Sequence, residues 1–372
     1  MLVYFIALAL SILFCVLHNR ATKKGLKILF AILSCLPFFL VTAFRGNSVG
    51  IDTWNNYSPI YNNIASYGEN FDTFSWLQAK YEPGFSLIII SLASIFKDPT
   101  MLFIFGAGII TFFTFSAIYK QSKKPLLSIL IYFLSGAILL GMNGMRGYMS
   151  LAIVLYTLQF VQQRKLLPFV IFIILASLIH KSSLPFILLY PLWNLVIKPK
   201  YALIATIATV PLLPIIYNLF AIFLQGSGST YSNYFQGNSI VNPTISMLII
   251  NVFLLAFFAV NFKNHQKDKL YNLFLKLQVI SVIVCILSFK IPLAFRMEQI
   301  IDFFQILSIP YNLYLIQKHP PKKSKANIYY ILLAAVIAMF SAYFVNTFIL
   351  NDDNQVRNNK TVFEEGEGHA NS

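Results

Sequence analysis

Charged residues are scarce in this chain of 372 residues. They make up 11% of it, whereas a soluble domain carries about 25%. Hydrophobic residues make up 58%, and the mean hydropathy is +0.70. Because so few polar side chains cannot cover so large an apolar core, a secreted or cytosolic globular enzyme is excluded. We expect an all-α polytopic membrane bundle, since about 20 residues cross a membrane as a helix and the length allows roughly a dozen crossings.

Several residue patterns are also missing. The three cysteines, at positions 15, 35 and 285, lie inside apolar runs, so no disulfide framework is indicated. The sequence has no glycine-rich phosphate loop, no HExxH, no paired CxxC and no dinucleotide fingerprint. The Asp-x-Asp signature with which many transferases of nucleotide sugars hold a divalent metal is absent as well. A redox or zinc enzyme has no support, and we expect neither a cofactor nor a metal.

Acidic residues are few, 13 against 28 basic ones, and the net charge is +15. Of the basic residues, 18 lie in six short connections between apolar runs, within 20–27, 120–124, 164–165, 198–200, 263–269 and 318–325. The positive-inside rule makes these connections cytoplasmic. Because the chain has no separate basic domain, we expect no nucleic-acid partner.

Apolar runs between residues 2 and 350 predict a single polytopic domain, 1–350, with 12 or 13 transmembrane segments. From residue 120 onward the runs alternate across the membrane without exception. Two full crossings between 82 and 119 would put the basic residues 120–124 on the wrong side. One of these two segments is therefore expected to be re-entrant or interfacial, and 82–96 is the shorter.

Two longer loops, 45–81 and 225–243, are expected on the external side. In the first, Trp54, Tyr57, Tyr61 and Ile64 follow Asp52 at helical spacing, which predicts a short amphipathic helix at the membrane interface. The second is rich in Gly, Ser and Asn and is typical of a flexible connector. The polar tail, 351–372, is expected to be disordered.

The polar residues outside the basic connections fall into five groups on the external side. They are Arg45 to Thr53 with Tyr57, Glu82-Pro83-Gly84-Phe85, Met142 to Arg146 with Asn143, His180-Lys181-Ser182, and Arg296 followed by Glu298, Asp302 and Gln305. Singly, each has a structural explanation as a snorkelling arginine, a helix cap, a satisfied histidine or a stripe that binds helices together. Jointly, three arginines, a histidine and two carboxylates on one side of so weakly charged a chain indicate a site.

Such a group of side chains suits one kind of chemistry. Guanidinium groups bind phosphate or diphosphate with bidentate geometry and stay charged when partly desolvated. His180 can take a proton from an attacking hydroxyl near neutral pH, and Asp52 or Glu82 could do the same or orient a substrate. A phosphate-activated transfer reaction on a substrate presented from the lipid is the natural inference.

The ordered motifs resemble those of the EpsG family of Wzy-type polysaccharide polymerases. The resemblance lies in Arg45-x4-Gly50-x-Asp52-Thr53-x3-Tyr57, Glu82-Pro83-Gly84-Phe85, Met142-Asn143-x2-Arg146, His180-x-Ser182, and Arg296 with Pro310 downstream. Gly147 departs from the pattern, since the family commonly has glutamine at this place. No single motif is specific, but their order and spacing are fairly so.

The resemblance implies a metal-independent glycosyltransferase that joins oligosaccharide repeat units carried on undecaprenyl diphosphate, at the outer face of the bacterial cytoplasmic (inner) membrane. The product would be O-antigen, capsule or exopolysaccharide, and a chain-length regulator protein is a possible partner. Carried over by position, Arg45, Arg146 and Arg296 would bind the diphosphate. His180 would be the general base with Asp52 as the second choice, while Glu82, Asn143 and Tyr57 would position the substrate.

Two other classes of protein stay open from the sequence. A flippase or transporter for a lipid-linked oligosaccharide also needs cationic groups, although it would line a passage that reaches both faces. A ligase or another sugar-lipid transferase has nearly the same chemistry as a polymerase. A purely structural protein predicts that the arginine and histidine positions tolerate substitution.

Overall fold

The computed structural model describes residues 1–67, 76–77, 80–196, 198–226, 245–260, 262–319, 328–352, 354–357 and 360–362. Over these residues the chain is helical, without a strand, and an isolated antiparallel bridge joins Arg45 to Thr361. The prediction of an all-α fold is confirmed. The external loop expected at 225–243 lies almost wholly outside the described residues. Where one domain was expected over 1–350, the chain forms two compact units, Met1–Tyr190 with Phe340–Ser372, and Pro191–Met339.

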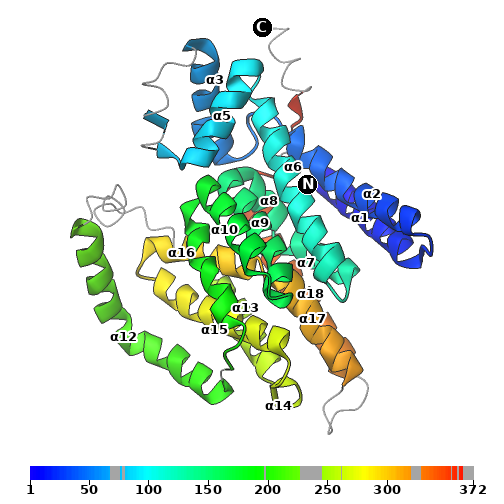
Figure 1. The fold of residues 1–372 in the computed structure, drawn as a ribbon, viewed down its shortest axis with the longest axis vertical. Coiled ribbons are helices and arrows are strands. Elements are labelled where there is room, and N and C mark those ends of the chain that lie inside the picture. Colours follow the sequence, from blue (N-terminus) through cyan, green and yellow to red (C-terminus); the bar gives the residue numbers. More distant parts are fainter. Residues whose placement is uncertain are drawn as a thin grey trace. The chain divides into compact units, whose positions relative to one another are not determined.

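The first unit holds the N-terminal helices and the end of the chain (Figure 1). Its elements are α1 (Leu2–Arg20), α2 (Lys24–Ala43), the π-helical turn η1 (Thr53–Tyr57), α3 (Ser58–Tyr67), α5 (Pro83–Ile95), α6 (Thr100–Gln121), α7 (Pro125–Leu134), α8 (Ala137–Asn143), α9 (Met145–Gln162), α10 (Leu166–Ile179), the 3₁₀ segment η2 (Lys181–Leu188) and the turn η4 (Val345–Asn351). The helix expected in the 45–81 loop is thus present as η1 and α3.

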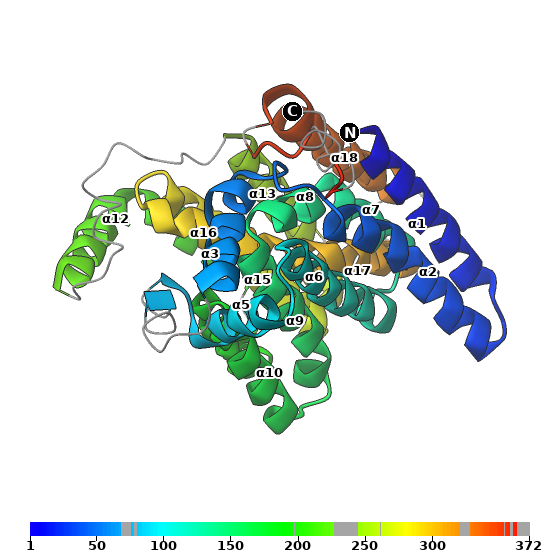
Figure 2. The ribbon, with the colours of Figure 1, turned by 90° about the horizontal axis from the view of Figure 1, so that it is seen from above.

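Helix α9 lies at the centre of the first unit, packed against α6, α8 and α10, while α1 and α2 run side by side as a hairpin (Figure 2). Aromatic rings fill the space beside this hairpin. Phe38 lies 6.0 Å from Tyr132 edge to face, and Phe133 stacks on Phe344 at 4.9 Å. Phe344 belongs to the C-terminal part of this unit, Phe340–Ser372, so this part shares a core with the N-terminal helices.

The apolar run 125–142, expected as one segment, is broken into α7 and α8. The two helices meet at a 50° bend. Gly136 sits at the break with φ +71, a conformation that favours glycine. A Cβ there would lie 2.0 Å from the ring of Phe348, so the glycine also makes room for a side chain of η4.

The second unit contains α12 (Pro199–Gly226), α13 (Ile245–Ala259), α14 (Phe262–His265), α15 (Lys269–Ser288), α16 (Pro292–Asp302) and α17 (Gln305–Lys318), and α11 (Leu189–Leu192) and α18 (Ile328–Phe344) cross its boundaries. Helix α15 packs against α12, α13 and α16. The polar residues that follow Arg296, along α16 and at the start of α17, face the interior of this unit. Glu298 and Gln305 are buried, and the Asn251 amide links Glu298 with Asp302.

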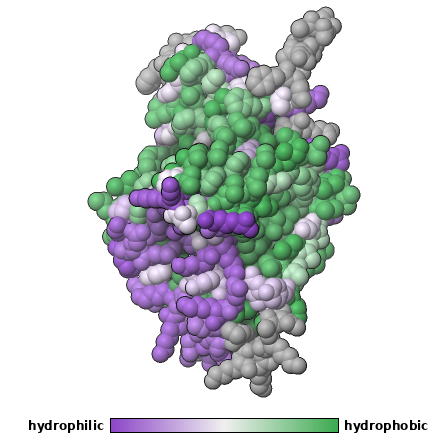
Figure 3. All heavy atoms as spheres, turned by 90° about the vertical axis from the view of Figure 1, so that its right-hand side faces the viewer, coloured by the Kyte–Doolittle hydropathy of each residue, from purple (hydrophilic) through white to green (hydrophobic). Residues whose placement is uncertain are grey.

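Among the residues that the structure describes, five helices are long and apolar enough to cross a membrane, and the bent pair α7 and α8 counts as a sixth if the pair is one span. The five are α1, α2, α6, α15 and the helix that runs from Ile328 through η4 to Asn351. On the face drawn in Figure 3, apolar side chains form broad areas of the surface. Leu13 is 51% exposed and Ile32 is 56% exposed, which is favourable in lipid and unfavourable in water. The chain is a multi-pass membrane protein, and the larger count of 12 or 13 segments stays a prediction.

Helix α5, in the stretch where the alternation fails, has only 13 residues. At 1.5 Å per residue it is about 20 Å long, short of the roughly 30 Å hydrocarbon core. The following helix, α6, has 22 residues and meets the length and hydropathy criteria for a span. By length α5 is the weaker candidate of the two for a full crossing, and its re-entrant or interfacial placement stays a prediction.

Candidate functional site

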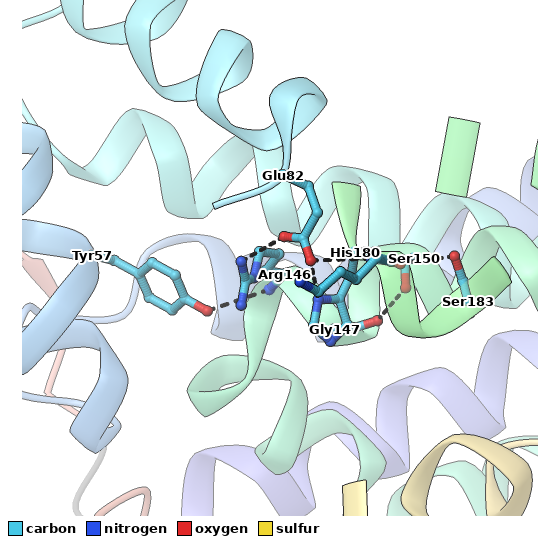
Figure 4. A network of polar contacts seen from close by, with 8 residues as sticks. Tyr57, Glu82, Arg146, Gly147, Ser150, His180 and Ser183 are labelled. Carbon is cyan, nitrogen blue, oxygen red and sulfur yellow. Dashed lines mark hydrogen bonds and ion pairs between the residues drawn. The ribbon is translucent and has the colours of Figure 1, made fainter. Parts of the chain in front are cut away.

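Three hydrogen-bond donors converge on the carboxylate of Glu82 (Figure 4). Arg146 donates from Nη1 to Oε2 over 2.6 Å, and the His180 ring nitrogen Nδ1 lies 3.2 Å from Oε1. The backbone N–H of Lys181 donates to the same Oε1 over 3.1 Å. The second, third and fourth sequence motifs thus meet at one carboxylate.

Helix ends bring these residues together. Glu82 precedes Pro83 at the start of α5, Arg146 lies in the first turn of α9, and His180 follows the last residue of α10. Proline is favoured at a first helical position, and a carboxylate there is stabilised by the positive end of the helix. His180 leaves the helix with an extended backbone, φ −153 and ψ 112, before the 3₁₀ segment η2 begins.

Aromatic rings enclose the Arg146 guanidinium. Its Cζ lies 4.9 Å from the Tyr81 ring centroid and 5.9 Å from that of Phe85. The Arg146 backbone N–H donates to the Tyr57 hydroxyl at 3.5 Å. Arg146 and His180 keep 18% and 13% of their side-chain surface exposed, against 9% for Glu82. The Glu82 carboxylate is therefore the most buried of the three groups, and the Arg146 guanidinium and the His180 imidazole are more exposed.

Electrostatics keep Glu82 ionised. Burial alone raises the pKa of this carboxyl, but the hydrogen bond from His180, the charge of Arg146 and the Lys181 N–H together lower its pKa to about 2. A carboxylate with so low a pKa is a poor proton acceptor at neutral pH. Because an ionised carboxylate only accepts hydrogen bonds, the His180 Nδ1 must be the protonated nitrogen. The other ring nitrogen, Nε2, is then the basic one.

Arg45 is placed differently from Arg146, since its side chain is 1% exposed. Its Nη1 donates to the Thr42 carbonyl over 2.7 Å, its Nη2 donates to the Met142 carbonyl over 3.0 Å, and its guanidinium lies 4.4 Å from the Phe103 ring centroid. These carbonyls belong to the last turns of α2 and α8, which have no partners within their own helices. Arg45 thus ties two helix ends together. Burial lowers the pKa of Arg45 to about 10, so it stays cationic at neutral pH.

Replacing Arg45 with methionine is expected to destabilise the protein, because two buried carbonyls lose their donor. The free energy of unfolding should fall by about 1–3 kcal/mol for the stranded groups. Thermal unfolding of the protein in detergent measures this loss. Wild-type stability combined with lost activity would instead mean that Arg45 contacts substrate directly.

Asp52 and Asn143 form a second polar contact in the first unit. The Asp52 backbone N–H donates to Asn143 Oδ1 over 2.9 Å, and Asn56 Nδ2 donates to Asp52 Oδ1 over 3.1 Å. Tyr57 lies between this pair and Arg146. Burial raises its pKa to about 12, with the charges of Arg146, Asp52 and Arg45 also acting on the hydroxyl.

Arg296 lies in α16 of the second unit, and its side chain is outside the described residues. Its predicted role in diphosphate binding stays a prediction. Within the described part of the chain, no group of three or more His, Cys, Asp or Glu residues could hold a metal ion.

Two contributors were missed from the sequence. Tyr81 precedes Glu82, but only the fold shows that its ring faces Arg146. Asn354 lies in the tail expected to be disordered, yet its Oδ1 accepts a hydrogen bond from Asn143 Nδ2 over 2.9 Å. A local sequence pattern cannot predict a contact between residues so far apart in the chain.

Fold and site together define an all-α multi-pass membrane protein with a guanidinium–carboxylate–imidazole cluster. The chain belongs to the EpsG family, whose model matches residues 27–355 and thus includes every residue of the site described above. No curated protein and no solved structure matches the chain. Membership of this family gives the chain a polysaccharide polymerase-like role.

Proposed function

We propose that the chain is a glycosyltransferase that joins undecaprenyl-diphosphate-linked oligosaccharide units at the outer face of the cytoplasmic membrane. The observation that carries the proposal is the carboxylate of Glu82, bonded at once to His180 and Arg146. This arrangement supplies both things that the reaction needs, a base for the acceptor hydroxyl and a cation for the leaving diphosphate.

In the proposed reaction, a hydroxyl oxygen of the incoming unit attacks the anomeric carbon of the growing chain. The new C–O bond forms as the bond from that carbon to the diphosphate oxygen breaks, and the electron pair leaves with the lipid diphosphate. The hydroxyl proton passes to His180 Nε2. Glu82 accepts the hydrogen bond from Nδ1, which fixes the tautomer and stabilises the imidazolium that forms.

Arg146 is the proposed contact to the diphosphate. One of its N–H groups is engaged by Glu82, and a guanidinium has five. Stacking beside Tyr81 holds the plane of the group before substrate arrives, so that little reorganisation is needed in the reaction. In this proposal Glu82 positions His180 and Arg146 as well as the substrate, and Arg45 acts through the helix ends that it joins.

The remaining candidates for orienting the acceptor are Asp52, Asn143 and Tyr57. Asp52 is also the second candidate for the base. The basic connections support an outer location for the site. The basic connections and the connections that carry Arg45, Asn143 and His180 join different pairs of apolar runs. The positive-inside rule assigns the basic ones to the cytoplasm.

A deletion strain tests the proposal through the length of its surface polysaccharide on gels. We expect deletion to leave single repeat units and the wild-type gene to restore the ladder of longer chains. His180→Ala and Arg146→Ala at matched membrane levels should fail to restore it. Losing a base typically slows a reaction by about 10²–10⁴-fold, and losing one group that stabilises the developing charge by about 10²–10³-fold. His18→Ala is the matched control, since His18 is bonded to the Lys27 carbonyl away from the cluster.

Two results would overturn this proposal. A full ladder from both His180→Ala and Arg146→Ala would remove the cluster from the reaction. Loss of even the single repeat unit on deletion would mean that supply across the membrane had failed, which is the behaviour of a transporter.

A further inference from the structure

The described residues of 352–362, called here the C-terminal strap, run along the loop that begins at Arg45. Four backbone hydrogen bonds join the two segments. They run from Gly46 N–H to the Lys360 carbonyl (2.7 Å), from Gly50 N–H to the Gln355 carbonyl (3.0 Å), from Ile51 N–H to the Asn354 carbonyl (3.3 Å) and from Val362 N–H to the Phe44 carbonyl (3.2 Å). Both segments lie in the first unit. The first part of the expected disordered tail is thus bonded along its length.

The strap is fastened on the side away from the loop as well. The Tyr4 hydroxyl of α1 donates to the Val356 carbonyl over 2.8 Å. Within the strap, the Asp352 carboxylate accepts hydrogen bonds from the backbone N–H groups of Val356 and Arg357 at 2.9 and 3.1 Å, which closes a turn. Val356 is fully buried. The strap therefore has its own fixed conformation and does not depend on the loop alone.

Asn354 is the residue through which the strap contacts the candidate site. Its Oδ1 accepts from Asn143 Nδ2 over 2.9 Å, and Asn143 Oδ1 in turn accepts from the Asp52 N–H over 2.9 Å. The Asn143 amide is thus held at both ends, with its nitrogen toward the strap and its oxygen toward the loop. Asn143 is the last residue of α8 and lies three residues before Arg146, which is in the first turn of α9.

The loop needs such support because it is poorly fixed by its own sequence. Gly50 has φ +90, and glycine adopts this and many other conformations with little difference in energy. Its backbone comes close to Asn143, since a Cβ at Gly50 would lie 3.5 Å from the Asn143 Cα. A rotated Asn143 amide would release the Asp52 N–H and let this contact loosen.

We propose that Asn354 is a positioning residue of the polymerisation site, which orients the Asn143 amide and through it the loop that bears Asp52. The inference rests on the proposed function. The strap is then a part of the site, contributed by the last described residues of the chain.

The test measures initial rates of polymer formation by the purified full-length protein in proteoliposomes. The substrate is the lipid-linked repeat unit extracted from the deletion strain. Asn354→Ala is expected to lower kcat about tenfold with little change in KM, since a small misplacement of reacting groups slows a reaction strongly. Asn354→Asp keeps an oxygen that accepts from Asn143 and should restore most of the rate. Asn351→Ala is the matched control, because the Asn351 side chain donates to the exposed Asn346 carbonyl and the contact lies outside the cluster.

A double-mutant cycle decides whether the effect passes through Asn143. In an Asn143→Ala background, Asn354→Ala should cause no further loss. Independent, multiplying losses would overturn the inference, and so would an Asn354→Ala protein as fast as the wild type. Either result leaves the proposed function standing, provided that His180→Ala is slow in the same assay. If His180→Ala is also fast, it is the proposed function that fails.

Discussion

Glutamine in place of Glu82 is expected to slow polymer formation by about 10²-fold or more. The substitution keeps the size of the side chain but leaves one accepting oxygen where Arg146, His180 and Lys181 now donate to two. At least one donor then faces the amide nitrogen, which also donates. The tautomer of His180 is no longer fixed, and Arg146 loses its counterion.

Stability should fall as well, by about 1–3 kcal/mol, less than for a fully buried pair because Arg146 is partly exposed. Asp98→Asn is the matched control. Its carboxylate accepts from the Thr100 N–H at the start of α6, outside the cluster. A Glu82→Gln protein that makes polymer as fast as the control would remove the carboxylate from the mechanism.

The same substitution has an expected pH signature. Because the pKa of Glu82 is lowered to about 2, its contribution to stability is complete above the ordinary carboxyl pKa of 4.5 and is lost only as the pH falls through about 2. Between about pH 5 and pH 7 the difference in free energy of unfolding between the wild type and Glu82→Gln should therefore not shrink. Thermal unfolding in detergent measures this difference, and one that shrinks toward pH 5 would show that the carboxyl takes up a proton there and that its pKa is not depressed.

Alanine at Gly84 is expected to be the most damaging of the conservative substitutions. An added Cβ would lie 2.8 Å from the Leu178 carbonyl oxygen, and a backbone atom of α10 cannot move aside as a flexible side chain can. Helix α5 must then shift away from α10, which separates Glu82 at the start of one helix from His180 at the end of the other. A displacement of about 1 Å can cost roughly 10²-fold in rate.

Gly147→Ala provides the matched comparison, since Gly147 lies beside the same histidine. A Cβ there would meet His180 Cδ2 at 3.8 Å, an ordinary van der Waals distance. We expect a rate within about twofold of the wild type and a slightly more stable α9, because alanine favours a helix over glycine by about 1 kcal/mol. Polymer length on gels and thermal unfolding in detergent measure both variants. Equal behaviour of the two would contradict the close packing of α5 on α10.

The sequence was informative about which polar residues to examine. In so apolar a chain, each charge outside the basic connections is a candidate for function. On that ground the sequence predicts Glu82, Arg146 and His180 as site residues. The helical class followed from composition in the same way. The sequence predicts the start of a helix where proline favours the first helical position, as Pro83 does in α5.

Local patterns could not supply what depends on distant segments. A full span, a bent pair of helices and a short helix all show the same apolar run in the sequence, so the bend between α7 and α8 within 125–142 cannot be predicted from it. The burial of Arg45 depends on two carbonyls, one of which belongs to α8 far along the chain. The polar composition after residue 350 favoured disorder, but backbone bonds to the 44–51 loop and an apolar anchor at Val356 fix its first part.

The strap has a consequence for how the protein is made. Tyr4 and Val356 are hydrogen-bonded although 352 residues separate them, and the loop after Arg45 takes its partners from the same late segment. During synthesis, the early helices enter the membrane long before the ribosome has translated those partners. The nascent chain can thus insert its first spans without these contacts, and in the proposed role of Asn354 the site is complete only when the segment around this residue has been released and has docked.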